Sequence, residues 1–182
     1  VGTSEPALSV LAEHGGRASL AELTLLPFDD GAFDLVCALD IVEHVDDGDG
    51  ALAELVRVAK PGAVLLISTP LHPSLWTAFD DFVGHKRRYE PQALVDLLHQ
   101  HGLAVERSAV FGMKPRSSRL VDMGMWWLTH HREIAMSTYN RAFMPLGLRF
   151  QKPLQLEPGL IAMDEVDEIL LVCRTTGAGA AA

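Results

Sequence analysis

The sequence predicts an α/β fold in which helices cover both faces of a largely parallel, doubly wound sheet. Two uninterrupted apolar runs, at 34–39 and 63–68, are typical of parallel strands that are buried on both faces. Segments with apolar residues at helical spacing alternate with these runs along the chain. A stretch rich in Met and Trp, 113–165, precedes a last apolar run at 167–174, so we expect a helical insert before the final strand.

Capping and turn residues give the expected boundaries in the first half of the chain. Ser4 is a good N-cap, and the glycines at 15 and 16 should end the first helix. Pro61 and Gly62 should end the second helix in the same way. The expected elements of this half are a helix at 4–15, a strand at 17–21, a strand at 34–39, a helix at 50–59 and a strand at 63–68.

The second half begins with a long loop whose aromatic residues favour an ordered, functional segment. Pro91 is suited to the first turn of a helix that should end at Gly102. The other expected elements are a strand at 103–111, a helix at 117–130 within the insert, and a strand at 167–174.

Composition limits the classes of function. The chain has 182 residues, 48% of them hydrophobic and 21% charged, which is ordinary for one globular domain. Its net charge of −9 disfavours nucleic acid and anionic membranes as partners. No window resembles a membrane span or a signal peptide. Cys37 and Cys173 lie in apolar runs, so we expect buried, reduced thiols and a cytoplasmic protein.

Three blocks of sequence, taken together, resemble one protein family. They are "LPFDDGAFDLVCALDIVEHV", "LAELVRVAKPGAVLLISTP" and "GLAVERSAVF". In order and spacing they resemble the class I S-adenosylmethionine-dependent methyltransferases, in particular those that act on small molecules. The likeness covers residues 4–111, and 167–174 matches the final antiparallel strand of that family.

The resemblance implies a Rossmann-like sheet of order 3-2-1-4-5-7-6 with S-adenosylmethionine across the carboxyl ends of the strands. Glu22 and Leu23 fall where the family holds the adenine, the carboxylate as hydrogen-bond acceptor and the leucine against the ring. Leu39 and Asp40 fall at the end of the fourth strand, beside the methionine part of the cofactor. For Glu22 and Asp40 the alternative is a solvated carboxylate.

The chain departs from the family pattern at its start. The first strand of the family and its glycine-rich loop have no counterpart, and Gly2 stands where an acidic residue should hold the ribose. Without that strand, two strand edges would lie unpaired. We therefore expect a fragment of a longer protein. The alternatives are a non-catalytic homologue and a fold that another chain completes.

Two histidines are candidate catalytic residues. Methyl transfer from a sulfonium is an in-line displacement, and a general base helps when the acceptor carries a proton. His44 follows the fourth strand of the family and His85 lies in the loop after the fifth, both at the end of the sheet that should face a substrate. His72 is a weaker candidate. Each could instead form only structural hydrogen bonds.

The segment from Asp40 to Asp47 is unusually rich in ionisable groups. Asp40-x-x-Glu43-His44 resembles the Glu-x-x-Glu-His that binds a divalent cation in some methyltransferases of quinone precursors and RNA ends. The first position is Asp, and Glu-His is common in relatives without a known metal, so we expect no metal. We interpret the segment as a site rim followed by the acidic start of a helix.

The basic run "HKRRY", 85–89, has two interpretations. Its arginines could clamp a carboxylate or phosphate of the substrate. A structural role, with Tyr89 anchoring the next helix, is the preferred interpretation.

These observations predict a core at 1–112 and 166–176, a helical lid at 113–165 and a disordered tail at 177–182. The lid residues could equally pack on the sheet or form a homodimer surface. The predicted function is methyl transfer to O, N or C of a small-molecule substrate. The alternative is a non-catalytic, methyltransferase-like binding or oligomerisation module, and a Rossmann-type oxidoreductase is disfavoured by the motifs.

Overall fold

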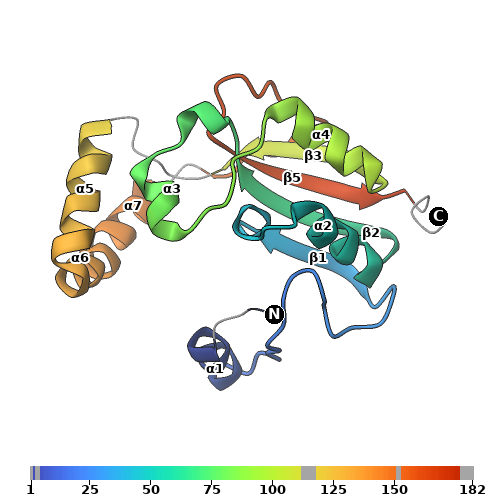
Figure 1. The fold of residues 1–182 in the computed structure, drawn as a ribbon, viewed down its shortest axis with the longest axis horizontal. Helices are drawn as coiled ribbons and strands as arrows, with labels where there is room; N and C mark the ends of the chain where they lie inside the picture. Colours follow the sequence, from blue (N-terminus) through green and yellow to red (C-terminus); the bar gives the residue numbers. More distant parts are fainter. Residues whose placement is uncertain (1, 3–4, 112–117, 151–152, 177–182) are drawn as a thin grey trace.

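The computed structural model describes residues 2, 5–111, 118–150 and 153–176 and contains one mixed sheet (Figure 1). Its strand order is β1-β2-β5-β3-β4. β1 and β2 pair in parallel, whereas β5 is antiparallel to both β2 and β3. The strands are β1 (Phe33–Leu39), β2 (Ala59–Pro70), β3 (Leu103–Val110), β4 (Glu157–Pro158) and β5 (Glu168–Thr175).

This order confirms the predicted α/β fold with a final antiparallel strand. β5 inserts between β2 and β3, as the last strand of the expected sheet does between its fifth and sixth strands. β1 has β2 as its only strand neighbour among the described residues, so it forms an edge of the sheet there. That edge is the side on which the first strand of the expected sheet order would lie.

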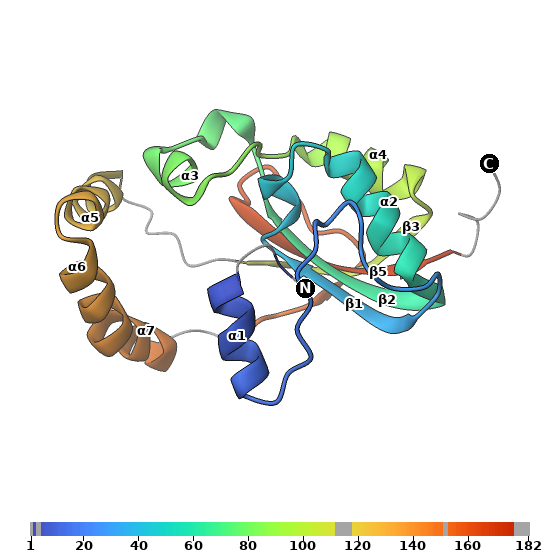
Figure 2. The ribbon, with the colours of Figure 1, turned by 60° about the horizontal axis from the view of Figure 1, so that its bottom comes forward.

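Two helices cover one face of the sheet (Figure 2). They are α2 (Gly48–Val58) and α4 (Pro91–Gln100). The Asp47 side chain caps α2 by accepting a hydrogen bond of 2.8 Å from the Gly50 amide. Leu52 and Leu98 are among the helical residues that are fully buried against the strands. The helical periodicity therefore predicted the faces that form the core.

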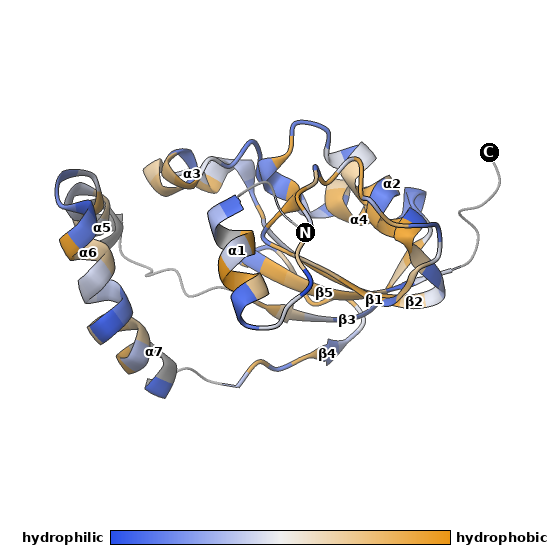
Figure 3. Ribbon diagram, turned by 90° about the horizontal axis from the view of Figure 1, so that it is seen from below, coloured by the Kyte–Doolittle hydropathy of each residue, from blue (hydrophilic) through white to orange (hydrophobic). Residues whose placement is uncertain are grey.

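The core is centred on β2 and β5, and Figure 3 shows apolar residues concentrated in these strands. Side chains from alternate positions of both strands are completely buried; they are Leu65, Ile67, Ile169, Leu171 and Cys173. This burial confirms the prediction for Cys173.

The prediction that β1 is buried on both faces was wrong. Leu35 is 53% and Leu39 43% exposed, and Cys37 is also exposed, whereas Ala38 is buried. The side chains of a strand alternate between faces, and only the face toward α2 is covered by described residues. The strand expected at 17–21 is also absent; this segment forms only an isolated bridge between Gly2 and Leu20. The helix before it is α1 (Glu5–Glu13), beyond the β1 edge (Figure 1).

The insert is helical, as predicted, and lies beside α3 (Ala78–Val83), away from the strands (Figures 1 and 2). Arg132 lies 5.9 Å from the Phe82 ring of α3. Much of the apolar surface of the insert is exposed, for example Trp126 and Phe143. Its elements are α5 (Ser118–His130), α6 (Arg132–Thr138), a π-helical turn (Tyr139–Phe143) and α7 (Met144–Phe150).

In the part of the chain that the structure describes, no helix combines the length and apolarity that a membrane crossing needs. The tail predicted at 177–182 lies outside the described residues.

Candidate active site

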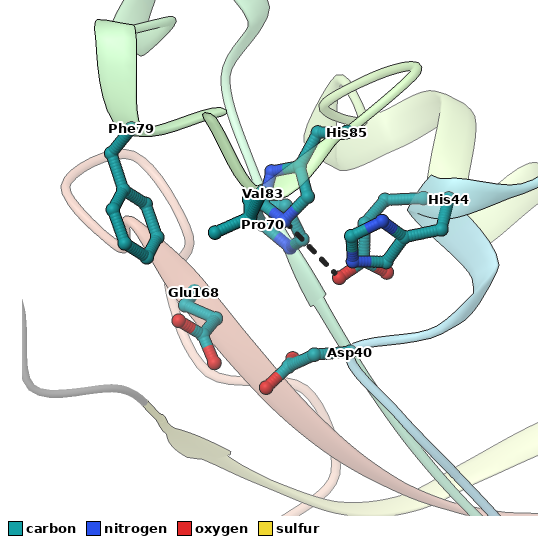
Figure 4. Close-up of a pocket in the computed structure, with 8 residues that line it drawn as sticks. Asp40, His44, Pro70, Phe79, Val83, His85 and Glu168 are labelled. Carbon is teal, nitrogen blue, oxygen red and sulfur yellow. Dashed lines mark ion pairs between the residues drawn. The ribbon is translucent and has the colours of Figure 1, made fainter. Parts of the chain in front are cut away.

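A cavity of about 270 Å³ lies where β1 and β2 end and β5 begins (Figure 4). Five of its lining residues carry ionisable side chains, and three are apolar. None of these lining residues is Lys or Arg. The lining residues are Asp40, Glu43, His44, Pro70, Phe79, Val83, His85 and Glu168. The cavity is therefore acidic at one end and apolar toward Phe79 and Val83.

Asp40 follows the last residue of β1 and is held by the neighbouring strand. Its amide donates to the Ser68 hydroxyl at 2.9 Å, and that hydroxyl donates to Asp40 Oδ1 at 2.6 Å. The backbone of Asp40 has φ 50°, a left-handed conformation that Asp tolerates better than most residues. His72, just after β2, has φ 58°. The chain therefore turns sharply at the end of both parallel strands.

Glu43 lies in a short 3-10 helix, Val42–His44, and its side chain is fully buried. Its Oε2 accepts a long hydrogen bond of 3.4 Å from the Thr69 hydroxyl. Its Oε1 is also buried and has no hydrogen-bond partner among the residues that the structure describes. Burial, assisted by the nearby charge of Asp40, raises the pKa of Glu43 to about 7.

The two predicted histidines come together at the cavity although they lie far apart in the sequence. Their ring centroids are 4.7 Å apart, with planes at 74°. His44 Nδ1 donates to the Gly84 carbonyl at 3.2 Å, and His85 Nε2 lies 3.8 Å from Glu43 Oε1 (dashed line in Figure 4). Burial, and then the adjacent His85, lower the pKa of His44.

The loop that carries His85 is organised by the buried carboxylate of Asp80. Asp80 accepts hydrogen bonds from the Thr77 amide, from His85 Nδ1 at 2.9 Å and from Arg88 Nε at 2.8 Å. Arg88 also donates to the Leu71 carbonyl and to Asp167. Burial alone would raise the pKa of Asp80, but the hydrogen bonds from Arg88, His85 and Thr77 lower it well below its usual range.

The basic run therefore has the structural role that the sequence analysis preferred. Arg88 is buried in its ion pair with Asp80, and Arg87 donates to the Val45 carbonyl at 2.8 Å. Tyr89 is buried in the core. Asp80 was not identified from the sequence, although its spacing to His85 and Arg88 within one short loop was a usable signal.

The structure brings some of the predicted site residues to the cavity and places others elsewhere. Asp40, His44 and His85 all line the cavity. Leu39 precedes Asp40 at the end of β1 but is not part of the lining, and neither are Glu22, which is exposed, and Leu23, which is half-buried beside the core. His72 donates to the Met163 carbonyl at 2.9 Å, which is a structural contact.

Glu168, the first residue of β5, was missed because the sequence does not show which end of an antiparallel strand meets the site. Burial, followed by the charge of Asp40 and a hydrogen bond with it, raises the pKa of Glu168 to about 8; Asp167 and Glu43 add smaller repulsions. Two carboxyl groups of this cavity are thus held with pKa values near neutrality.

We expect Asp80→Asn to destabilise the protein by about 3–5 kcal/mol, because Arg88 would keep a buried charge without its full partner. Chemical denaturation monitored by circular dichroism measures this change. Asp81→Asn, at the exposed neighbouring position, is the matched control and should stay within about 0.5 kcal/mol of the wild type. Equal stability of both variants would contradict the proposed importance of the buried pair.

We expect the free energy of unfolding to fall between about pH 5 and pH 8 through Glu168. Its folded pKa lies above its ordinary value, so the folded state binds this proton more tightly and loses that advantage as the pH rises through about 8. Glu168→Gln should flatten this slope, measured by urea denaturation at several pH values. Glu165→Gln, at an exposed position, should follow the wild type. A slope unchanged by Glu168→Gln would refute the assignment.

Comparisons with known proteins show what parts of the chain resemble. Residues 1–67 match a family model described as a methyltransferase domain. The chain is 44% identical over 50 residues to norajmaline N-methyltransferase of Rauvolfia serpentina, covering 28% of this chain and 17% of that protein. It is 40% identical over 74 residues to demethylmenaquinone methyltransferase of Parafrankia sp., covering 38% and 29%. These matches therefore span less than a third of each relative.

The likeness to a methyltransferase structure extends over almost the whole chain. A crystal structure of an S-adenosylmethionine-dependent methyltransferase from Thermotoga maritima superposes with a TM-score of 0.61. The match covers 95% of this chain and 70% of that one at 15% identity, so it concerns the fold. Residues 1–67 thus resemble a methyltransferase domain, and the described residues share the fold of this S-adenosylmethionine-dependent methyltransferase.

Proposed function

We propose that the protein transfers a methyl group from S-adenosylmethionine to a small molecule held in the cavity of Figure 4. One observation carries the proposal: Asp40, His44 and His85, from separate segments, meet in one cavity at the carboxyl ends of the parallel strands. In open α/β sheets this end of the strands is where ligands bind. The alternative, a non-catalytic binding module, needs neither the cavity nor its histidines.

The cofactor would lie at the end of β1. Asp40 offers a half-buried carboxylate there, which suits the positively charged methionine part, with Leu39 beside it. Glu22 and Leu23 would hold the adenine, since the exposed carboxylate can accept a hydrogen bond and the leucine offers an apolar surface. These residues fit the two ends of the cofactor, and none of them is assigned a hydrogen bond to its ribose. When bound, the cofactor supplies an electrophilic methyl group.

The histidines would serve the acceptor. His85 Nδ1 is fixed by Asp80, so its Nε2 is directed toward Glu43 and the cavity. A carboxylate that fixes one nitrogen of an imidazole leaves the other oriented to take a proton. When the acceptor is a hydroxyl or an amine, this pair of imidazoles would take the proton that it loses on methylation. Phe79 and Val83 would exclude water from the reacting atoms.

The size of the cavity, about 270 Å³, suits a small acceptor or one end of a larger one. Norajmaline N-methyltransferase and demethylmenaquinone methyltransferase, by their names, act on small organic molecules, which supports this substrate class. O, N and C remain candidate accepting atoms. A cytoplasmic location and a homodimer through the exposed apolar residues of the insert are also proposals.

Calorimetric titration of the purified protein with S-adenosylmethionine should show binding with a dissociation constant in roughly the micromolar range, because substrate-level affinities are typical of such cofactor sites. Asp40→Asn is the informative variant, since Asn also tolerates a positive φ and removes only the charge. We expect weaker binding in that variant. Absence of detectable heat with the wild-type protein would favour the non-catalytic alternative.

Replacing either histidine by alanine should lower kcat by about 10²–10⁴-fold, the usual contribution of a proton-transferring group. Affinity for the cofactor should change little, because neither His44 nor His85 lies at the strand tip. A radiometric methyl-transfer assay against a panel of amines, phenols and quinols measures the effect. His99→Ala removes an exposed imidazole from α4 and is the matched control. Unchanged transfer in both His44→Ala and His85→Ala would exclude them as bases.

A further inference from the structure

We propose that Glu43, His44 and His85 together bind one divalent transition-metal ion at the inner end of the cavity. Each residue offers one ligand atom, and these atoms all lie within 4.8 Å of one another. Two donors on a tetrahedral zinc ion at about 2.1 Å are about 3.4 Å apart. Glu43 Oε1 and His85 Nε2 are 3.8 Å apart, so this pair would have to approach by only about 0.4 Å to share an ion.

The carboxylate of Glu43 is the strongest indication. It is fully buried, and its Oε1 forms no hydrogen bond with the described residues; its nearest charged neighbour in the ion-pair geometry is His85 Nε2 at 3.8 Å. A buried polar atom without a partner is unfavourable, and buried carboxylates are usually paired with a cation or bound to a metal. No Lys or Arg is found among the described residues that line this cavity. An ion between Glu43 and the two imidazoles would supply the missing partner.

The imidazoles are oriented as metal ligands commonly are. His85 donates its Nδ1 proton to Asp80 at 2.9 Å, and His44 donates its Nδ1 proton to the Gly84 carbonyl at 3.2 Å. Each bond fixes the ring and leaves Nε2 with its lone pair available. Hydrogen bonds of this kind, from the second ring nitrogen to a carboxylate or carbonyl, are a general feature of histidine metal ligands. The carboxylate of Asp80 is itself fixed by Arg88.

The donor set also limits the identity of the ion. Two imidazole nitrogens and one carboxylate oxygen suit Zn²⁺ and neighbouring first-row ions, whereas Mg²⁺ and Ca²⁺ prefer oxygen ligands. Three protein ligands leave a fourth tetrahedral position open, as in catalytic zinc sites. That position would face the cavity. Asp40 lies outside this ligand set, since it is held by Ser68, so the geometry differs from a site built on Asp40, Glu43 and His44.

The open position gives the ion a role that rests on the proposed methyl transfer. A hydroxyl or amine of the acceptor that binds there would lose its proton more readily, because the positive charge stabilises the deprotonated form. With the ion bound, the two imidazoles hold the ion, and the proton of the acceptor passes to solvent and not to their Nε2 atoms. Binding of the ion itself requires no cofactor or acceptor, so it can be tested separately.

The test is titration of the purified protein, freed of metal by chelation, with Co²⁺ alone in the absence of S-adenosylmethionine. We expect one equivalent to bind and to produce the visible d–d absorption of a four-coordinate Co²⁺ site, which Zn²⁺ should displace. Glu43→Gln keeps the shape of the side chain and should weaken binding at least about tenfold, as should His85→Ala. His99→Ala, outside the cavity, should leave the spectrum and the affinity unchanged.

Thermal unfolding monitored by circular dichroism would establish that Glu43→Gln is folded at the temperature of the titration. Absence of the d–d band in the wild-type protein would overturn the proposal, and so would equal Co²⁺ affinity in the wild type and in a folded Glu43→Gln variant. Cofactor binding detected by calorimetry without Co²⁺ binding would sustain the proposed methyltransferase function and reject the metal site. Co²⁺ binding without cofactor binding would sustain the metal site and reject the proposed methyltransferase function.

Discussion

The candidate site depends on one buried carboxylate, that of Asp80. Its two oxygens receive hydrogen bonds from Thr77, His85 and Arg88, and Arg88 extends the connection to Asp167 beside β5. One side chain thus closes the loop after β2, orients an imidazole and ties both to the sheet. Because Asp80 and Arg88 are both buried, removal of either partner leaves a charge that water cannot reach. The loop therefore keeps a defined shape although it follows the end of a strand.

The sequence predicted the elements that repeat a local pattern. The apolar runs predicted β1 and β5 nearly to the residue. The position of β5 between β2 and β3 was implied only by the family resemblance. His44 and His85 could be assigned to one end of the sheet because both follow parallel strands. Glu168 could not, since its position depends on the direction in which β5 crosses the sheet. The exposure of Cys37 could not be predicted either, because an apolar run does not show which face of the strand is covered.

The contacts of Asp40 and Glu43 explain why a strand of the core ends in so many acidic groups. Asp40 accepts a hydrogen bond from Ser68 and lies at the end of β1, whereas Glu43 is buried and its Oε1 forms no hydrogen bond with the described residues. The first arrangement suits a carboxylate that meets a ligand from solvent. The second is unfavourable in isolation and suits a carboxylate that completes a site with a positively charged occupant. The two carboxyl groups of Asp40 and Glu43 are therefore close in sequence but lie in different surroundings.

The exposed edge of β1 has a consequence for the colloidal behaviour of this chain. Among the described residues, one side of the strand has no partner, and Leu35 and Leu39 expose apolar surface next to it. A strand edge of this kind is a template on which another extended segment can pair, whether from the same polypeptide or from a neighbouring molecule. Cys37 adds a free thiol on the same surface. Concentrated samples should therefore be kept reduced, and turbidity that grows with concentration would originate at this edge rather than at the cavity of Figure 4.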